Sequence, residues 1–444
     1  MLLDFYEKYI NSKVEVDGDY VVFHLAAPKV YFLNIIAQGS SWGAILDSKA
    51  AMGLGLWDGK ADGWWKFHDW KKEDSPLYTK EIGSGPYELV EWNRAEQKVT
   101  LKAFTEYWRG LAKVENVVIW GVDKWSTKKA LLEKGEADII YVPYEHIPEI
   151  QNDLDLKIIN NLSTLSITAM AFNWNISQDS PYVGSGKLDG NGIPVDFFSD
   201  KNVILGFIYS FKYSKLIDSV LGGNGKIIPT CLPQGVLGYS DTLHKPAYYY
   251  NTAIRYFKDA FNGDLWERGF KITILYNVNN FSRQKVAEIL AESLKNINSK
   301  FEIKVKEVDW PTFLDARNNG KMPLYVLGWL ADYPDPNNFI YTFYHSNGTY
   351  GYYYGEKYTQ FANKSQAFFD GKSLNEIIID ATEESTINFR EDIYIKIQKF
   401  VISEGINVPL YQPLKNKVFR EWLKGFEFNP IVPGDDFYKY EKIE

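Results

Sequence analysis

The stretch that decides the fold lies at residues 329–339, which read WLADYPDPNNF and follow the apolar run 322–330. That run shows no polar alternation, which predicts a strand buried on both faces of a parallel or mixed sheet. Pro334 and Pro336 end the strand, because proline cannot donate a ladder hydrogen bond. Asp335 followed by Pro336 then predicts an N-cap and a first helical residue for a helix over 337–344.

One carboxylate, Asp332, is left at the carboxyl end of this predicted central strand. Ligands of open α/β sheets bind at the carboxyl ends of the strands, so Asp332 is a candidate ligand contact. The alternative is that Asp332 caps a turn. The local pattern favours neither interpretation.

Composition excludes several classes of protein. A chain of 444 residues is expected to form two or three domains, and 45% hydrophobic with 24% charged residues is typical of a folded protein. The net charge of −8 argues against a nucleic-acid partner. Cys231 is the single cysteine, which excludes an internal disulfide, and no histidine pair has metal-ligand spacing. We therefore expect no metal and no cofactor.

Aromatic residues are unusually frequent, at 16% of the chain with 14 Trp and 31 Tyr. Some must fill the core, but a surplus also suits a cleft for amphipathic ligands such as sugars or peptides. Trp64 and Trp65 lie in a Gly- and Asp-rich segment, 57–70, which predicts a loop. Their indoles either pack against their own domain or form a stacking platform for a ligand.

A serine-hydrolase pattern is present at residues 39–43, which read GSSWG. The pattern places Ser41 as a nucleophile between a strand and a helix, which 31–37 and 44–52 could form. It also requires a histidine and an acid elsewhere in the chain. The pattern is loose, and we keep a serine hydrolase only as the alternative from a different functional class.

The remaining pattern predicts a chain with two α/β regions. Asp17 and Gly18 between apolar residues predict a two-residue hairpin turn. Strands and a helix alternate over 114–141, and a strand, a helix and a strand are predicted over 271–305. A continuous helix is predicted over 201–221.

An ordered set of motifs extends over nearly the whole chain. The motifs are GSGPYELVEW at 83–92, YWRG at 107–110, GEADI at 135–139, FN at 172–173, LGGNG at 221–225, GWLADYPDP at 328–336, and Arg390 with Tyr394. This set resembles the extracytoplasmic solute-binding proteins of family 5, the dipeptide- and oligopeptide-type receptors of ABC importers. The order of the motifs makes the resemblance specific, although each motif alone is loose.

The resemblance implies an α/β fold of the periplasmic-binding-protein type (type II), with two lobes, a mixed sheet in each, and a remnant of a small extra domain. On this mapping, residues 1–80 are the end of the extra domain and a linker. Residues 81–171 and 421–444 form the first lobe, and 172–420 form the second. The mapping also implies that the family's first strand and export signal correspond to sequence upstream of Met1.

The resemblance also implies a set of ligand contacts. The strand end Gly328 to Leu330 would pair its main chain with an extended peptide, and Asp332 would neutralise the peptide's amino terminus. Arg317 matches an arginine that can pair the ligand's carboxylate, with a plain surface arginine as the alternative. The other predicted contacts are Trp310 and Trp329, which wall side-chain pockets or pack in the core, together with Tyr333, Trp64 and Trp65.

The predicted function is a non-enzymatic, monomeric receptor that binds a short peptide between its lobes and delivers it to ABC permease subunits. Such a receptor acts outside the cytoplasm, in the periplasm or at the cell surface, where a lipid anchor is one mode of attachment. The alternative ligand within this family is an oligosaccharide, because sugar faces stack on indoles such as those of Trp64 and Trp65.

Overall fold

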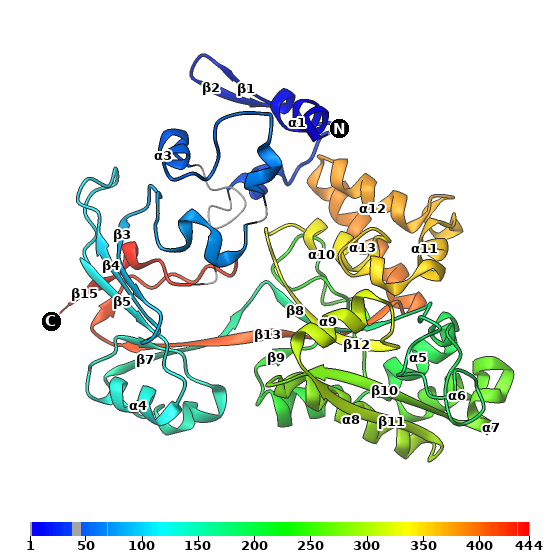
Figure 1. Cartoon of the computed structure of the whole chain (residues 1–444). Helices are drawn as coiled ribbons and strands as arrows, with labels where there is room; N and C mark the ends of the chain where they lie inside the picture. The colour runs from blue at the N-terminus through cyan, green and yellow to red at the C-terminus, as the bar shows by residue number, and fades with distance from the viewer. Residues whose placement is uncertain (1, 38–45, 69, 433, 444) are drawn as a thin grey trace. The chain divides into compact units, whose positions relative to one another are not determined.

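The computed structural model describes residues 2–37, 46–68, 70–432 and 434–443. The chain forms two compact units, one of Met1–Ile159 with Asn416–Glu444 and one of Asn160–Lys415 (Figure 1). The predicted division of the first part at residue 80, and the other predicted domain boundaries, stay predictions. None of the described helices combines the length and the apolar character needed to cross a bilayer.

The first unit begins with a helix and a hairpin. In the hairpin, Asp17 lies opposite Tyr20, and Gly18 has a φ of +58°, as a two-residue turn of this type requires. The predicted hairpin is confirmed, but its two turn residues are Gly18 and Asp19, because Asp17 is already a strand residue. The elements are α1 (Leu2–Tyr9), β1 (Val14–Asp17), β2 (Tyr20–Phe23), α2 (Phe32–Ile36) and α3 (Ser48–Gly53).

The rest of the first unit contains an antiparallel three-stranded sheet, followed by a β-α-β segment. Leu132 on the helix packs with Val142 and with Val418 near the carboxyl end of the chain, and all three are fully buried. The elements are β3 (Tyr87–Asn93), β4 (Lys98–Ala103), β5 (Asn116–Trp120), α4 (Trp125–Glu133), β6 (Ile139–Ile140), β14 (Leu423–Lys424) and β15 (Glu441–Lys442).

The second unit is built on an antiparallel sheet in which β8 (Ser166–Phe172) lies between β12 (Leu324–Leu330) and β13 (Asn407–Arg420). The remaining residues of β13 continue into the first unit, where Val418 and Phe419 pair with β6. The short strand β9 (Gly225–Lys226) and β7 (Leu156–Ser163) also pair with β13.

The position of β12 corrects one prediction. The strand exists and its residues 324–327 are buried, as expected, but it pairs antiparallel with β8 and lies at the end of the hydrogen-bonded order. It is therefore an edge strand, not a central one. Its residues 324–327 are buried although it lies at the end of the order, and the sequence alone cannot distinguish this from burial between two strands.

The second unit also contains a parallel pair of strands joined by a long helix. β10 (Phe270–Asn277) and β11 (Phe301–Val308) pair along their full length, and α8 (Phe281–Ile297) lies beside them in Figure 1. Val286, Leu290 and Leu294 are buried on one face of α8, and the strand, helix and strand predicted over 271–305 are confirmed.

The predicted helix over 201–221 is wrong in its extent. α5 (Lys201–Ser210) stops at Phe211, which takes an extended conformation and packs its buried ring against Tyr213. A separate π-helix covers Lys215–Val220. Burial of the Phe211 ring accompanies the break in the helix, and this tertiary contact is not visible in the local pattern.

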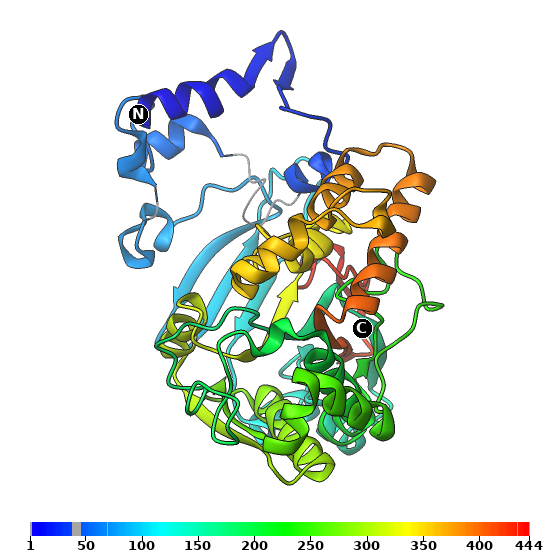
Figure 2. The same cartoon turned by 90° about the vertical axis from the view of Figure 1, so that its right-hand side faces the viewer.

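Helices form the rest of the second unit. α12 and α13 lie side by side in both views of the chain (Figures 1 and 2). The helix predicted over 337–344 is confirmed with these bounds. The helices are α6 (Tyr250–Asp259), α7 (Asp264–Arg268), α9 (Trp310–Asn318), α10 (Asn337–Tyr344), α11 (Glu356–Asn363), α12 (Leu374–Glu383) and α13 (Ile387–Glu404).

A buried histidine follows α10. His345 stacks on Tyr341 with ring centroids 4.3 Å apart, and its Nδ1 accepts a hydrogen bond of 3.0 Å from the Asn347 backbone N–H. The ring is therefore held neutral, and burial lowers the pKa of His345 to about 4.

This lowered pKa predicts a pH-dependent stability. An unfolded histidine titrates near pH ~6.5, so between that pH and the folded pKa of about 4 the unfolded chain binds more protons at His345. The contribution of His345 is complete above this window and is lost as the pH falls through it. The urea midpoint should therefore drop more between about pH 7 and about pH 5 in the wild type than in His345→Gln. Equal drops would contradict the prediction.

Candidate ligand-binding site

The outer edge of β12 directs main-chain groups away from its strand partner. The Ala331 N–H donates to the Leu165 carbonyl at 2.8 Å, so the main-chain groups of Ala331, and of Trp329 two residues earlier, point toward the strand partner. In an antiparallel pair the intervening residues point the other way. Gly328 and Leu330 therefore direct their N–H and C=O groups away from β8. Both residues are exposed, and the exposed fraction of Leu330 is 50%.

Asp332 is held in place by Asn338, which comes from α10. The Asn338 amide oxygen accepts hydrogen bonds from the Asp332 backbone N–H at 3.0 Å and from the Trp329 indole at 2.9 Å. The Asn338 amide nitrogen donates to Asp332 Oδ2 at 3.1 Å. Asn338 is itself buried, so its hydrogen bonds hold Asp332 and Trp329 in fixed positions. Sequence reasoning missed this residue, although an asparagine pair directly after two prolines was a usable signal.

The Asp332 carboxylate has no cation partner among the described residues. It is half-buried, and its one side-chain hydrogen bond is that from Asn338 to Oδ2. Among the described residues, no lysine, arginine or histidine lies within ion-pair distance of it, and no side-chain hydrogen bond reaches Oδ1. A half-buried carboxylate in this state favours binding of a cation, because burial makes an unpaired charge costly.

Trp329 and Tyr350 form an aromatic wall next to the strand edge. Their rings meet edge to face with centroids 5.6 Å apart, and the Tyr350 hydroxyl donates to the Gly328 carbonyl at 2.8 Å. Tyr333, also predicted as a contact, accepts a hydrogen bond from the Asn337 side chain at 2.9 Å. The structure thus brings Trp329, Gly328 and Asp332 together at the end of one strand.

Trp310 and Arg317 lie on the same face of α9, seven residues apart. Trp310 is 44% exposed and stacks on Phe313 with ring centroids 5.4 Å apart, so the indole is only partly used in packing. The Arg317 guanidinium lies 4.7 Å from the Tyr353 ring centroid. It donates to Asn318 Oδ1 from Nε at 3.1 Å and from Nη2 at 2.9 Å.

Arg283 was missed by sequence reasoning. It lies in the first turn of α8, with its guanidinium carbon 5.4 Å from the ring centroids of both Trp310 and Phe313. Burial lowers its pKa, and the positive charge of Arg317 lowers it further. A cation in the first turn of a helix opposes the helix dipole, and that unfavourable placement was the available signal.

The chain matches a family model over residues 3–351, described as bacterial extracellular solute-binding proteins, family 5. The chain belongs to this family. The predicted resemblance is thereby confirmed. Family 5 consists of solute-binding proteins, not of enzymes.

Relatives of this family 5 protein include the oligopeptide-binding protein AppA of Bacillus subtilis, 24% identical over 82% of this chain and 62% of the relative. The dipeptide-binding protein of Escherichia coli is 21% identical over 98% of this chain and 72% of the relative. The chain thus spans less than two thirds of the length of AppA.

Solved structures confirm the predicted fold class. The Helicobacter pylori periplasmic binding protein DppA, in complex with the peptide STSA, has a TM-score of 0.70 and 22% identity over 97% of this chain and 73% of that one. Bacillus subtilis AppA, in complex with a nonapeptide, has a TM-score of 0.68 and 21% identity over 97% and 78% of the two chains. These are α/β binding proteins of type II with mixed sheets.

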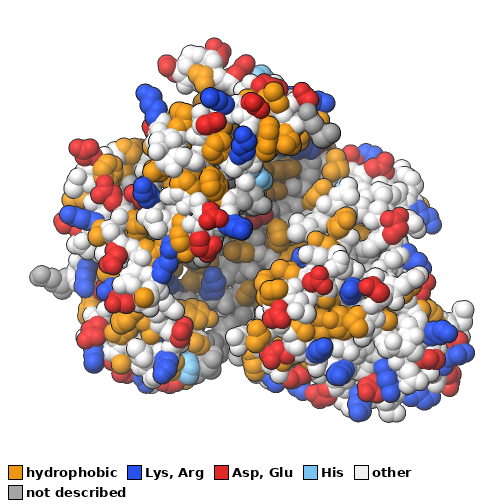
Figure 3. Space-filling view, in the orientation of Figure 1, with side chains coloured by type: hydrophobic (Ala, Val, Ile, Leu, Met, Phe, Trp, Pro, Cys, Tyr) orange, Lys and Arg blue, Asp and Glu red, His pale blue; other side chains and the backbone are white. Residues whose placement is uncertain are grey.

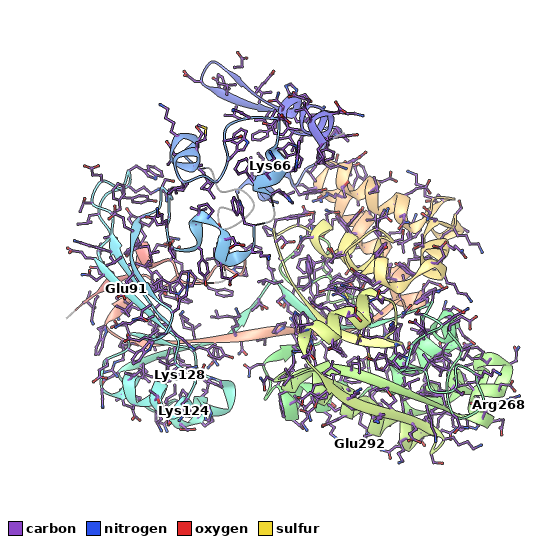
Figure 4. All side chains as sticks on the ribbon, viewed as in Figure 1. Lys66, Glu91, Lys124, Lys128, Arg268 and Glu292 are labelled. Atoms are coloured by element: carbon purple, nitrogen blue, oxygen red, sulfur yellow. The ribbon has the colours of Figure 1, made fainter. Side chains whose placement is uncertain are left out.

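The two adjacent tryptophans of the family 5 chain belong to the first unit. The predicted loop is wrong in detail, because Trp64–Phe67 forms a 3₁₀ helix, in which Figure 4 labels Lys66. The Trp64 indole donates to the Leu2 carbonyl at 3.1 Å and stacks on Phe5, so Trp64 packs against α1. Trp65 is half-buried, and its ligand contact stays a prediction.

The alternative nucleophile, Ser41, lies at residues 38–45, outside the described part of the chain. Among the described residues, no group of histidine, cysteine, aspartate or glutamate side chains is arranged to hold a metal ion. The candidate ligand-binding site therefore consists of the β12 edge, Asp332, and the side chains of Trp310, Arg283 and Arg317.

Proposed function

We propose that this chain is a non-enzymatic solute receptor that binds a short peptide along the outer edge of β12. The observation that carries the proposal is the outer strand edge, where the N–H groups of Gly328 and Leu330 point away from β8. The Asp332 carboxylate lies next to this edge and has no cation partner among the described residues. An extended peptide can pair its main chain with such an edge whatever its sequence. The neighbouring side chains then supply selectivity.

Charge complementarity sets the direction of the peptide. The α-ammonium group would lie at Asp332, where it completes an ion pair with a half-buried carboxylate. The carboxylate of the peptide would be paired by Arg317, whose planar fork suits a carboxylate. Trp310 and Trp329 would line pockets for peptide side chains.

The names of the relatives support this proposal, because AppA and the Escherichia coli protein are named for oligopeptide and dipeptide binding. Delivery of the peptide to an ABC permease, action outside the cytoplasm as a monomer, and closure of the lobes on the ligand are further parts of the proposal. An oligosaccharide is the second candidate ligand, because the Trp310 indole is 44% exposed and sugars stack on indoles.

Isothermal titration calorimetry on the full chain separates the two ligands. We expect measurable heat of binding with the peptide Ala-Ala-Ala and none with a β-linked glucose tetrasaccharide. Binding of the saccharide but not of the peptide would contradict the proposal and favour the second candidate.

A further inference from the structure

Arg283 and Arg317 have no anionic partner among the described residues, whereas about half of the other cations of the second unit have one. Arg268 pairs with Asp264 at 3.3 Å, and Lys215 pairs with Glu292 at 2.6 Å; Figure 4 labels Arg268 and Glu292. Figure 3 shows acidic and basic side chains mixed over the visible surface of this unit. Within the described part of the chain, no carboxylate lies within 4.0 Å of the Arg283 or Arg317 guanidinium. The two positive charges are thus left uncompensated.

Both guanidiniums retain free donors while their faces are covered. Arginine has five N–H donors. Arg283 gives one of them to Asn277 Oδ1, from Nη1 at 2.7 Å, and Arg317 uses its Nε and one Nη2 donor on Asn318. Trp310 and Tyr353 cover the guanidinium faces. The donors that remain lie in the plane of each guanidinium, which is the direction from which a carboxylate binds.

Tyr325 adds a second polar group without a partner in the neighbourhood of Arg317. Its side chain is fully buried, and its hydroxyl has no hydrogen-bond partner in the described structure. Tyr325 and Trp329 are four residues apart on β12, so their side chains lie on the same face of the strand. Burial raises the pKa of Tyr325, while the nearby charge of Arg317 lowers it. The phenol therefore stays protonated close to the arginines.

Two positive charges near each other and partly withdrawn from water are costly without a counter-ion. Burial of Arg283, together with the charge of Arg317, lowers the pKa of Arg283, which expresses this cost. A ligand with one carboxylate neutralises one of the two charges. A ligand with two neighbouring carboxylates neutralises both.

We propose that the peptide site selects ligands whose carboxyl-terminal residue is Asp or Glu. Arg317 pairs the α-carboxylate, and Arg283, beneath Trp310, pairs the side-chain carboxylate of the same residue. This inference rests on the proposed function, since it assumes that the ligand is a peptide with its amino terminus at Asp332. It adds a selectivity that the open strand edge itself does not supply.

The test compares Ala-Ala-Glu with the uncharged, equally sized Ala-Ala-Gln by calorimetry on the full chain. The wild type should bind Ala-Ala-Glu at least about tenfold more tightly than Ala-Ala-Gln. This ratio corresponds to one added charge pair. Arg283→Gln should abolish this ratio while it keeps affinity for Ala-Ala-Gln. Arg317→Gln should weaken both peptides, because it removes the partner of the α-carboxylate.

Arg268→Gln is the matched control, because it removes one positive charge from the same unit at an exposed ion pair. It should leave the ratio unchanged. Circular dichroism identifies any variant that fails to fold, and Arg283→Lys, which keeps the charge, should then retain a reduced ratio. Equal affinities for the two peptides in the wild type would overturn the inference but not the proposed function. An unchanged affinity ratio in folded Arg283→Gln would do the same. If neither Ala-Ala-Glu nor Ala-Ala-Gln binds, the proposed function and the inference are both overturned.

Discussion

Replacement of Asp332 by asparagine is expected to weaken binding of a free-amine peptide such as Ala-Ala-Ala by about 30-fold or more. Loss of one partner of a buried, hydrogen-bonded charge pair costs about 2–5 kcal/mol, and each 1.4 kcal/mol is about tenfold in affinity. Asparagine has the shape of aspartate, and its amide oxygen can still accept the hydrogen bond from Asn338. The loss should therefore reflect charge, and calorimetry measures it directly.

The peptide itself supplies the control for this prediction. N-acetyl-Ala-Ala-Ala lacks the ammonium group, so its affinity should differ little between the wild type and Asp332→Asn. Glu292→Gln, which removes a carboxylate from the exposed pair with Lys215, should leave the affinity for both peptides unchanged. Equal losses for the free and acetylated peptides in Asp332→Asn would show that Asp332 does not bind the amine.

The second large effect is expected at the buried ion pair of Asp335 and Arg390. The guanidinium donates from Nη1 and Nη2 to the two Asp335 oxygens at 2.8 and 2.7 Å, and the two side chains are only 6% and 7% exposed. Burial works against the charge of Arg390, but the hydrogen bond that the guanidinium donates to Asp335 raises the pKa of Arg390 above the usual range. Asp335 also accepts from the Asn337 backbone N–H at 2.8 Å, which fixes the start of α10 behind the site.

Arg390→Met should lower the free energy of unfolding by about 3–5 kcal/mol, because it leaves the Asp335 carboxylate buried without a partner. Urea unfolding followed by circular dichroism measures the loss. The double variant Arg390→Met with Asp335→Asn should be less destabilised than the single one, since no buried charge remains. Arg268→Met, at an exposed pair, should cost less than about 1 kcal/mol. A loss of similar size in the two arginine variants would contradict the account.

The sequence was most informative where local chemistry decides the structure. Two prolines fix the end of β12, and the helix that follows was predicted with the bounds it has. Asp335 was expected to be the N-cap of that helix. The structure has Pro336 in that position, with no side-chain cap. The Asp335 carboxylate still accepts from the Asn337 backbone N–H at 2.8 Å, and it is also paired with Arg390, 55 residues away in sequence. Such a partner is not readable from the local pattern.

The site was predicted less completely than the fold. Asp332, Trp329 and Gly328 were found because they are neighbours in the chain, and Trp310 and Arg317 came from the family resemblance. Arg283 was missed because its role depends on the packing of α8 against α9. The edge position of β12 was missed as well, because strand order depends on long-range pairing with β8.

Hydrogen exchange at the β12 backbone amides tests the central claim most directly. Gly328 and Leu330 point their amides away from β8, so both should exchange faster than the Trp329 amide in the free protein. Saturation with Ala-Ala-Ala should slow exchange at Gly328 and Leu330 and leave Trp329 nearly unchanged. If the peptide binds and the exchange rates of Gly328 and Leu330 do not fall, the peptide does not pair with the β12 edge and the account is wrong.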